Sequence, residues 1–76
     1  MVEHSLSQYV KEQRKSLGLT QVDLARHAGV GLRFVRDIEQ GKRSLRMDKV
    51  NQVLAMFGSI LGPVTMTAED RSGANR

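Results

Sequence analysis

The spacing of three small or branched residues constrains the fold of this chain more than any other feature of its sequence. Ala25, Gly29 and Val35 stand four and six positions apart, with Leu24 and Ile38 as the apolar residues at either end. An alanine lets a second helix cross close to the first, and a glycine permits the positive φ that a tight turn requires. The spacing therefore predicts two short helices joined by a glycine turn, either a helix-turn-helix or a plain helical hairpin.

Apolar residues recur at helical spacing in four segments, each closed by a glycine. The predicted helices cover residues 5–17, 21–27, 32–40 and 47–57. Ser5 and Thr20 are the expected N-caps of the first two helices, and Gln8 would complete a capping box with Ser5. Gly31 stands at the third cap, where it supplies no side-chain hydrogen bond. The residues expected on the inward stripes are Leu6, Tyr9, Val10, Gln13, Leu17, Leu24, Ala25, Val35, Ile38, Met47, Val50, Leu54 and Phe57.

The segment after residue 58 departs from this helical pattern. Pro63 excludes a helix interior, and residues 64–67 alternate apolar and polar side chains as a half-buried strand does. Residues 59–67 are therefore expected to hold one short β-strand. Residues 68–76 hold no large apolar residue and are expected to be disordered. The expected fold class is mainly α, with a four-helix domain over residues 5–58 and one short C-terminal β-strand.

A lone strand leaves its own backbone hydrogen-bonding groups unpaired. One solution is an antiparallel ribbon with the same strand of a second copy across a two-fold axis. The alternative is packing on its own domain. Chain length favours the first solution, because a domain below about 70–80 residues rarely gains more than about 3–5 kcal/mol from a single core. The dimerisation residues expected in this segment are Ile60, Leu61, Val64 and Met66.

The positive charge of the chain is concentrated in one segment. The formal net charge is +4 at pH 7, and residues 26–46 account for all of it, with Asp37 and Glu39 as their acidic members. A localised basic block favours a polyanionic partner, although a solvated helical face would carry the same side chains. The cationic residues of this block are Arg26, Arg33, Arg36, Lys42, Arg43 and Arg46.

Several functional classes are not expected from the composition. The chain has no Cys, which excludes a disulfide framework, a thiolate zinc site and a cysteine nucleophile. His4 and His27 lie too far apart to form a familiar metal-ligand pair, and no phosphate loop, dinucleotide motif or nucleophile–base motif is visible. The most apolar run, residues 53–64, is shorter than the roughly 20 residues that a membrane span requires. We therefore expect a soluble cytoplasmic protein that is not an enzyme and holds no metal or cofactor.

The stretch LGLTQVDLARHAGVGLRFVRDIEQGKRS, residues 17–44, resembles the helix-turn-helix core of the Xre/Cro/C1 phage-repressor family. The specific elements of this resemblance are residues 17–21, 24–25, 29–30, 38–39 and 41–42, within a match over residues 8–58. It implies a lambda-repressor-like four-helix fold and a dimeric protein that binds an operator in double-stranded DNA. Arg14 and Glu39 match a pair that forms a salt bridge between the first and third helices of similar repressors.

The resemblance also implies which residues would touch the DNA. The helix over residues 32–40 would be the recognition helix, with its N-terminal half against base edges in the major groove. Arg33 and Arg36 can each donate two hydrogen bonds to a guanine, and Leu32 can touch a thymine methyl group. Phe34 is left open between contact with the DNA and packing onto the protein. The base-reading positions would be Leu32, Arg33, Arg36 and Asp37, and the phosphate-contacting positions Thr20, Gln21, Phe34, Lys42, Arg43 and Arg46.

Two further kinds of residue are interpreted as structural. His27 borders the basic block but is expected to be a surface histidine rather than a phosphate contact. Met47, Met56 and Met66 are expected to fill the core or an interface, since methionine packs into irregular apolar gaps, rather than to form a site of their own.

The segment FGSILGPV, residues 57–64, resembles the tail of HipB-like antitoxins. That resemblance implies a small homodimer that binds its own operator and a HipA-like Ser/Thr kinase toxin. The sequence therefore predicts a homodimeric, sequence-specific repressor on a palindromic operator, with the autoregulating antitoxin of a type II toxin–antitoxin pair as the preferred interpretation. The alternatives are a phage-type or general transcriptional regulator without a toxin partner, and a protein-interaction module that has lost DNA binding.

Overall fold

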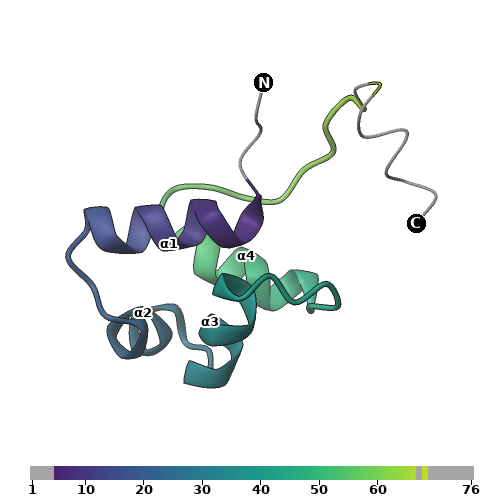
Figure 1. The fold of residues 1–76 in the computed structure, drawn as a ribbon. Helices are drawn as coiled ribbons and strands as arrows, with labels where there is room; N and C mark the ends of the chain where they lie inside the picture. Colours follow the sequence, from purple (N-terminus) through teal and green to yellow (C-terminus); the bar gives the residue numbers. More distant parts are fainter. Residues whose placement is uncertain (1–4, 67, 69–76) are drawn as a thin grey trace.

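The computed structural model describes residues 5–66 and residue 68 of the chain. Within these residues the chain folds into four helices, which are α1 (Leu6–Ser16), α2 (Gln21–Ala28), α3 (Leu32–Glu39) and α4 (Met47–Ala55). Helix α3 packs against both α1 and α2, and α2 also packs against α4 (Figure 1). The prediction of a mainly helical fold with four helices is confirmed, and each helix lies within two residues of its expected bounds.

The hydrophobic core takes side chains from all four helices. Val10, Leu24, Val35 and Val53 are fully buried, one from each of α1 to α4. Burying a side chain of this size contributes about 1.5–3 kcal/mol relative to leaving it in water. The buried hydrophobic residues of the described chain are Val10, Leu24, Ala25, Val35, Ile38, Val50, Val53 and Leu54.

The set of residues predicted to face the core is wrong at three positions. It includes Met47 and Leu17, but the exposed fractions of these residues are 68% and 54%. Met47 is the first residue of α4 and Leu17 is the C-cap of α1, so each lies at a helix end that the neighbouring helices do not cover. The predicted set also leaves out Val53, which is fully buried. Helical periodicity continues to the end of a helix even where the packed contact has stopped, so stripes fail there.

The turn between α2 and α3 has the conformation that the sequence spacing predicts. Gly29 ends α2 with φ 75° and ψ 31°, and its N–H donates to the Ala25 carbonyl oxygen at 3.0 Å. The Gln52 side chain of α4 donates to the carbonyl oxygens of Ala28 and Gly29 at 3.2 and 3.4 Å. These bonds tie the turn to α4. Gly31 then begins α3 without a side-chain cap.

The N-caps of α1 and α2 differ in how completely they form. At α1, Ser5 Oγ accepts from Gln8 N–H at 3.2 Å, but the Gln8 side chain donates to Glu12 and the expected capping box is only half formed. At α2, Asp23 N–H donates to Thr20 Oγ1 and Thr20 N–H donates to Asp23 Oδ2, both at 3.0 Å. The hydrogen bond from the Thr20 backbone, with that of its side chain, holds the pKa of Asp23 below its ordinary value of 3.8.

The segment after α4 holds no β-strand in the part that the structure describes, so the predicted strand is unsupported over residues 59–66. The start of the segment is instead tied to the helices. Tyr9 Oη and Ser59 Oγ lie 2.6 Å apart, and Leu61 N–H donates to Asn51 Oδ1 at 2.8 Å. A single chain offers this segment no neighbouring strand, and side chains of the helices take up its first polar groups.

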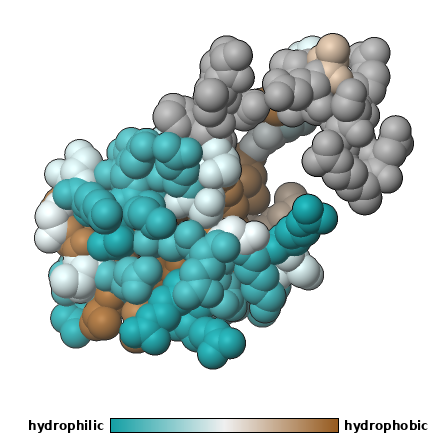
Figure 2. Space-filling model, in the orientation of Figure 1, coloured by the Kyte–Doolittle hydropathy of each residue, from teal (hydrophilic) through white to brown (hydrophobic). Residues whose placement is uncertain are grey.

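Most apolar side chains of this segment are exposed. Leu61 packs against the core, whereas Ile60, Val64 and Met66 are exposed, and Val64 reaches 85%. The visible face in Figure 2 is otherwise mostly hydrophilic, broken by small hydrophobic areas. The strand end expected at Thr67 and, of the disordered tail expected over residues 68–76, all but Ala68 lie outside the described residues.

Candidate nucleic-acid interface

Helix α3 buries one side and exposes the other. Val35, Ile38 and Glu39 are buried, whereas Arg33 and Arg36 are exposed. The Arg33 side chain is 88% exposed, so most of its guanidinium is open to solvent. Two outward arginines on one short helix offer the paired donors that guanine edges and phosphates accept.

The loop between α3 and α4 continues this surface. Lys42, Arg43 and Arg46 are all exposed, and Lys42 and Arg46 share a surface groove with Arg33 of α3. The cationic surface is defined here as Arg33, Arg36, Lys42, Arg43 and Arg46. Among the described residues, Arg36 and Arg43 have no ion-pair partner. Their charges are therefore available to a polyanion without the loss of an internal contact.

Asp37, expected to read a base, is engaged with two of these cations. Arg33 Nε lies 3.4 Å from Asp37 Oδ1, and Lys42 Nζ lies 3.6 Å from Asp37 Oδ2. Lys42 N–H also donates to the Asp37 carbonyl oxygen at 3.0 Å, and the Asp37 side chain is only 19% exposed. A base contact by Asp37 would have to replace these ion pairs. Exposed pairs of this kind contribute about 0.3–0.5 kcal/mol each, so DNA can displace them.

Arg46 has an acidic neighbour that sequence reasoning missed. Arg46 Nη2 lies 2.7 Å from Asp48 Oδ2, and this hydrogen bond, the first among several causes, holds the pKa of Asp48 below its ordinary 3.8. Lys49 was also missed, although it lines the same groove as Arg46. Its signal in the sequence was its position three residues after Arg46 at the start of a helix, where such side chains are neighbours.

The two apolar positions of α3 near this surface are half-buried. Leu32 and Phe34 both pack against the core, and Phe34 also lines the groove that holds Lys42 and Arg46. Packing on the protein, one of the two alternatives left open by the sequence, is thus observed for Phe34, and contact with DNA stays a prediction.

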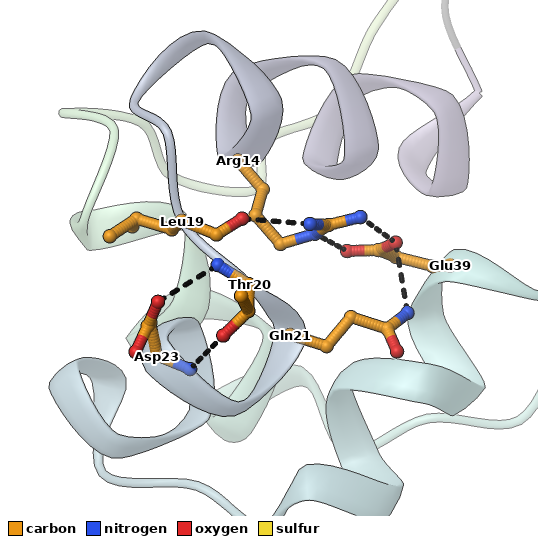
Figure 3. Close-up of polar contacts among 6 residues, drawn as sticks. All are labelled: Arg14, Leu19, Thr20, Gln21, Asp23 and Glu39. Atoms are coloured by element: carbon orange, nitrogen blue, oxygen red, sulfur yellow. Dashed lines mark hydrogen bonds and ion pairs between the residues drawn. The ribbon is translucent and has the colours of Figure 1, made fainter.

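A buried ion pair fixes α3 against α1 (Figure 3). Arg14 Nε lies 2.7 Å from Glu39 Oε2, and Arg14 Nη2 donates to Glu39 Oε1 at 3.1 Å. Arg14 Nη1 donates to the Leu19 carbonyl oxygen at 2.8 Å, and Gln21 Nε2 donates to Glu39 Oε1 at 3.1 Å. The structure thus forms the pair that the resemblance implies and adds Gln21 of α2 to it. One carboxylate joins three helices.

The environment of Glu39 keeps it ionised. Its side chain is only 2% exposed. Burial raises the pKa of Glu39, but the hydrogen bonds from Arg14 and Gln21 and the charge of Arg14 outweigh burial and hold the pKa below its ordinary value of 4.5. The network is fully satisfied, because the described residues contain no buried side-chain nitrogen or oxygen without a hydrogen-bond partner.

Some of the polar groups at the start of α2 already form hydrogen bonds within the protein, so only the remaining donors can bind a phosphate. Gln21 has one amide hydrogen committed to Glu39, and Thr20 Oγ1 accepts from Asp23 N–H. The second Gln21 amide hydrogen and the Gln21 backbone N–H remain as donors. The Asp23 carboxylate shares this helix end, so a phosphate would bind there against one nearby negative charge.

Comparison with known proteins identifies the family. The profile of the helix-turn-helix family matches residues 10–60, which contain most of α1 and all of α2, α3 and α4. The chain belongs to the helix-turn-helix family. The Xre/Cro/C1-type resemblance is confirmed at this level, and the family is one of DNA-binding transcription regulators. An uncharacterised helix-turn-helix-type transcriptional regulator of Sinorhizobium fredii (strain NBRC 101917 / NGR234), y4mF, is 47% identical in an alignment of 57 residues that covers 71% of this chain and 75% of that protein.

The described residues of this helix-turn-helix chain hold neither a membrane span nor a metal cluster. Over the described residues, no helix has the length and apolar character to cross a membrane. The same residues contain no group of three or more His, Cys, Asp or Glu side chains arranged to hold a metal ion.

Proposed function

We propose that this helix-turn-helix protein is a sequence-specific repressor that acts as a homodimer on a palindromic operator. The observation that supports this best is the cationic surface itself. Arg33 and Arg36 lie exposed on α3, while the buried Arg14–Glu39 pair holds the opposite side of the helix. An exposed, charged helix on a fixed support is what reading base edges in the major groove requires.

Different residues of the surface have different tasks in this proposal. Arg33 and Arg36 donate to base edges, with guanine O6 and N7 as their best acceptors, and Leu32 lies beside them. The cations of the following loop and the donors of the α2 start hold phosphates and set the register. The phosphate-contacting residues proposed are Thr20, Gln21, Lys42, Arg43 and Arg46.

The dimer is proposed to form through apolar side chains that a single copy leaves exposed. Met47 opens α4 and is exposed, and so are Ile60, Val64 and Met66 of the segment that follows the same helix. Covering them with a second copy would bury apolar surface that this small domain cannot cover by itself. Two recognition helices related by a two-fold axis would enter successive major grooves about 34 Å apart.

Selection of binding sites from a random-duplex pool, at physiological salt and with sequencing of the survivors, tests the proposal. We expect a two-fold-symmetric consensus with half-sites about 10 base pairs apart. Arg36→Ala should relax one position of each half-site, whereas Lys42→Ala should weaken all sites alike. Lys15→Ala is the matched control, because it removes an exposed cation of α1 outside the cationic surface.

The result that overturns the proposal is equally plain. If no sequence is enriched and binding is only salt-sensitive bulk association, the base-reading roles are wrong, and a protein-interaction module that has lost DNA binding becomes the better description. Enrichment of a single half-site by a protein that sediments as a monomer would overturn the dimer and leave DNA reading in place.

Within this function we propose the autoregulating antitoxin of a type II toxin–antitoxin pair, with a HipA-like Ser/Thr kinase toxin as partner. The support is the resemblance of residues 57–64 to HipB-like tails and the exposed apolar side chains of that segment. We expect a kinase-like gene next to this one and a stable complex of the two purified proteins. If the purified kinase-like protein does not bind, the chain is a phage-type or general regulator.

A further inference from the structure

A surface groove runs between the first half of α3 and the start of α4. Its volume is about 420 Å³. Two apolar and four cationic side chains line it together, namely Phe34, Leu45, Arg33, Lys42, Arg46 and Lys49. Gly31 also lines it, and a Cβ at Gly31 would meet nothing within 4 Å, so the groove has open space beside Gly31.

Contacts with the hydrophobic core hold the apolar side chains of this groove in place. Phe34 and Leu45 are half-buried and pack against the core, so their orientations are set by the fold rather than by a ligand. Asp37 contacts Arg33 and Lys42 at 3.4 and 3.6 Å and draws both cations toward the groove that all three line. The result is a preformed apolar surface within reach of several positive charges.

The apolar and cationic lining of the groove limits which chemical groups of DNA can bind there. A phosphate alone would use the cations but gains nothing from a phenyl ring. A base edge that presents only donors and acceptors would lose hydrogen bonds to water against Phe34 and Leu45. In the major groove of DNA, thymine is the base that presents a methyl group, at its C5 position, next to a hydrogen-bond acceptor and close to the phosphates of its own strand.

We infer that Phe34 and Leu45 form a contact site for the 5-methyl group of one operator thymine. Lys42, Arg46 and Lys49 bind phosphates that flank this thymine. The inference rests on the proposed DNA-binding function and deepens it, because it assigns Phe34 to direct readout of a base. It replaces the phosphate contact expected of Phe34, and it gives Leu45 and Lys49 roles that the sequence analysis left out.

Removal of a single methyl group from the DNA tests the inference with the natural protein. Each thymine of the selected operator is replaced in turn by deoxyuridine, and affinity is measured by fluorescence anisotropy at constant salt. One replacement per half-site should weaken binding about fourfold, the effect of losing about 0.8 kcal/mol of methyl burial. Replacement in both half-sites should weaken it about fifteenfold.

Protein variants identify the side chain that touches this methyl group. In Phe34→Ala the thymine and deoxyuridine operators should bind equally, whereas Leu32→Ala should keep the fourfold difference. Leu32→Ala tests the competing assignment, because Leu32 is the other half-buried apolar residue at the start of α3 and the family resemblance implies that it can touch a thymine methyl group. If Leu32→Ala removes the difference and Phe34→Ala keeps it, the inference is wrong.

A photochemical measurement covers the case in which Phe34→Ala does not fold. An operator with 5-iododeoxyuridine at the sensitive position is irradiated with the unaltered protein, and the cross-linked peptide is sequenced. A cross-link to Phe34 supports the inference, and a cross-link to Tyr9, His27 or Phe57 overturns it. If a symmetric operator is selected but every thymine is insensitive to loss of its methyl group, the inference fails while the proposed function stands; if no operator is selected, the proposed function itself fails.

Discussion

Replacing Arg14 by methionine should remove most of the stability of this domain. The variant keeps an unbranched apolar stem of similar length in the same place and loses the guanidinium. With it go the contacts to Glu39 Oε2 at 2.7 Å, to Glu39 Oε1 at 3.1 Å and to the Leu19 carbonyl oxygen at 2.8 Å. Glu39, with a side chain that is 2% exposed, is then left with Gln21 as its one side-chain donor among the described residues.

The size of the loss follows from the burial of this carboxylate. Breaking a buried ion pair by removing one partner costs about 3–5 kcal/mol, because the remaining charge stays out of water without compensation. A single core in a domain this small supplies about the same amount. Arg14→Met should therefore be largely unfolded at 25 °C and pH 7. The double variant Arg14→Met/Glu39→Leu should recover most of the stability, since two apolar side chains replace both charges.

The dependence on pH gives this prediction its sharpest test. In the natural protein the pKa of Glu39 is lowered, so its contribution is present above about pH 4.5 and is lost as the pH falls through the lowered folded value. Without Arg14, burial dominates and the folded pKa of Glu39 should rise above its unfolded value. Stability from this group is then greatest below the unfolded pKa and is lost as the pH rises. Above about pH 4.5 the contribution of Glu39 to the unfolding free energy should therefore stay constant in the natural protein and fall with rising pH in the variant.

Urea unfolding followed by circular dichroism at 222 nm measures both effects, with sucrose added to give the variant a folded baseline. Asp23 and Asp48 also have lowered pKa values, but they are present in both proteins and cancel in the difference. The double variant has no carboxylate at position 39, so its unfolding free energy should lack the fall with rising pH that is expected of Arg14→Met. A loss below about 1 kcal/mol, or the same pH slope in both proteins, would refute the claim that this pair holds α3 in place.

Three further substitutions have defined outcomes. Gly29→Ala should cost about 1–2 kcal/mol in thermal unfolding, because an alanine at φ 75° is strained whatever space is available. Thr20→Ala should cost about 1 kcal/mol through loss of the N-cap of α2, whereas Thr20→Ser should cost little. Asp37→Asn should raise affinity for non-specific duplex DNA about threefold to fivefold in a salt titration, since binding no longer has to break two exposed ion pairs of about 0.3–0.5 kcal/mol each; Asp48→Asn, which frees one cation, should raise it less.

Local signals in the sequence were sufficient to predict the four helices and to place their ends to within two residues. A glycine that must adopt positive φ and a threonine followed by an aspartate three residues later act within one turn of the chain, so Gly29 and Thr20 could be placed without knowledge of the fold. The exposure of Met47 could not be predicted in this way, because it depends on where the other helices end. The predicted C-terminal strand is unsupported for a related reason. Alternation of apolar and polar side chains produces a strand only where a partner strand exists, and the sequence of one segment does not show whether it has one.

Within the candidate site, residue types were easier to predict than the contacts between them. Outward arginines on α3 follow from the alternation of charge and apolar residues along that helix. The contacts of Asp37 with Arg33 and Lys42 did not, because Lys42 reaches back from a loop whose path the sequence does not state. Phe34 stayed ambiguous for a physical reason: a half-buried ring has one side for the core and another for the groove.

Substitutions that affect base reading should be separable from substitutions that affect the position of α3, because the residues for these two tasks lie on different sides of this one short helix. Helix α3 has eight residues, and an isolated helix shorter than about 12–15 residues is marginal in water. Its order therefore depends on the burial of Val35, Ile38 and Glu39. A substitution at Glu39 should lower the urea midpoint and weaken all DNA sites in proportion to the unfolded fraction, without changing their ranking. A substitution at Arg36 should change the ranking of sites and leave the urea midpoint unchanged. A variant of Glu39 with normal stability and an altered consensus would show that α3 can shift as a body, and base preference would then depend on the buried pair as well as on the exposed arginines.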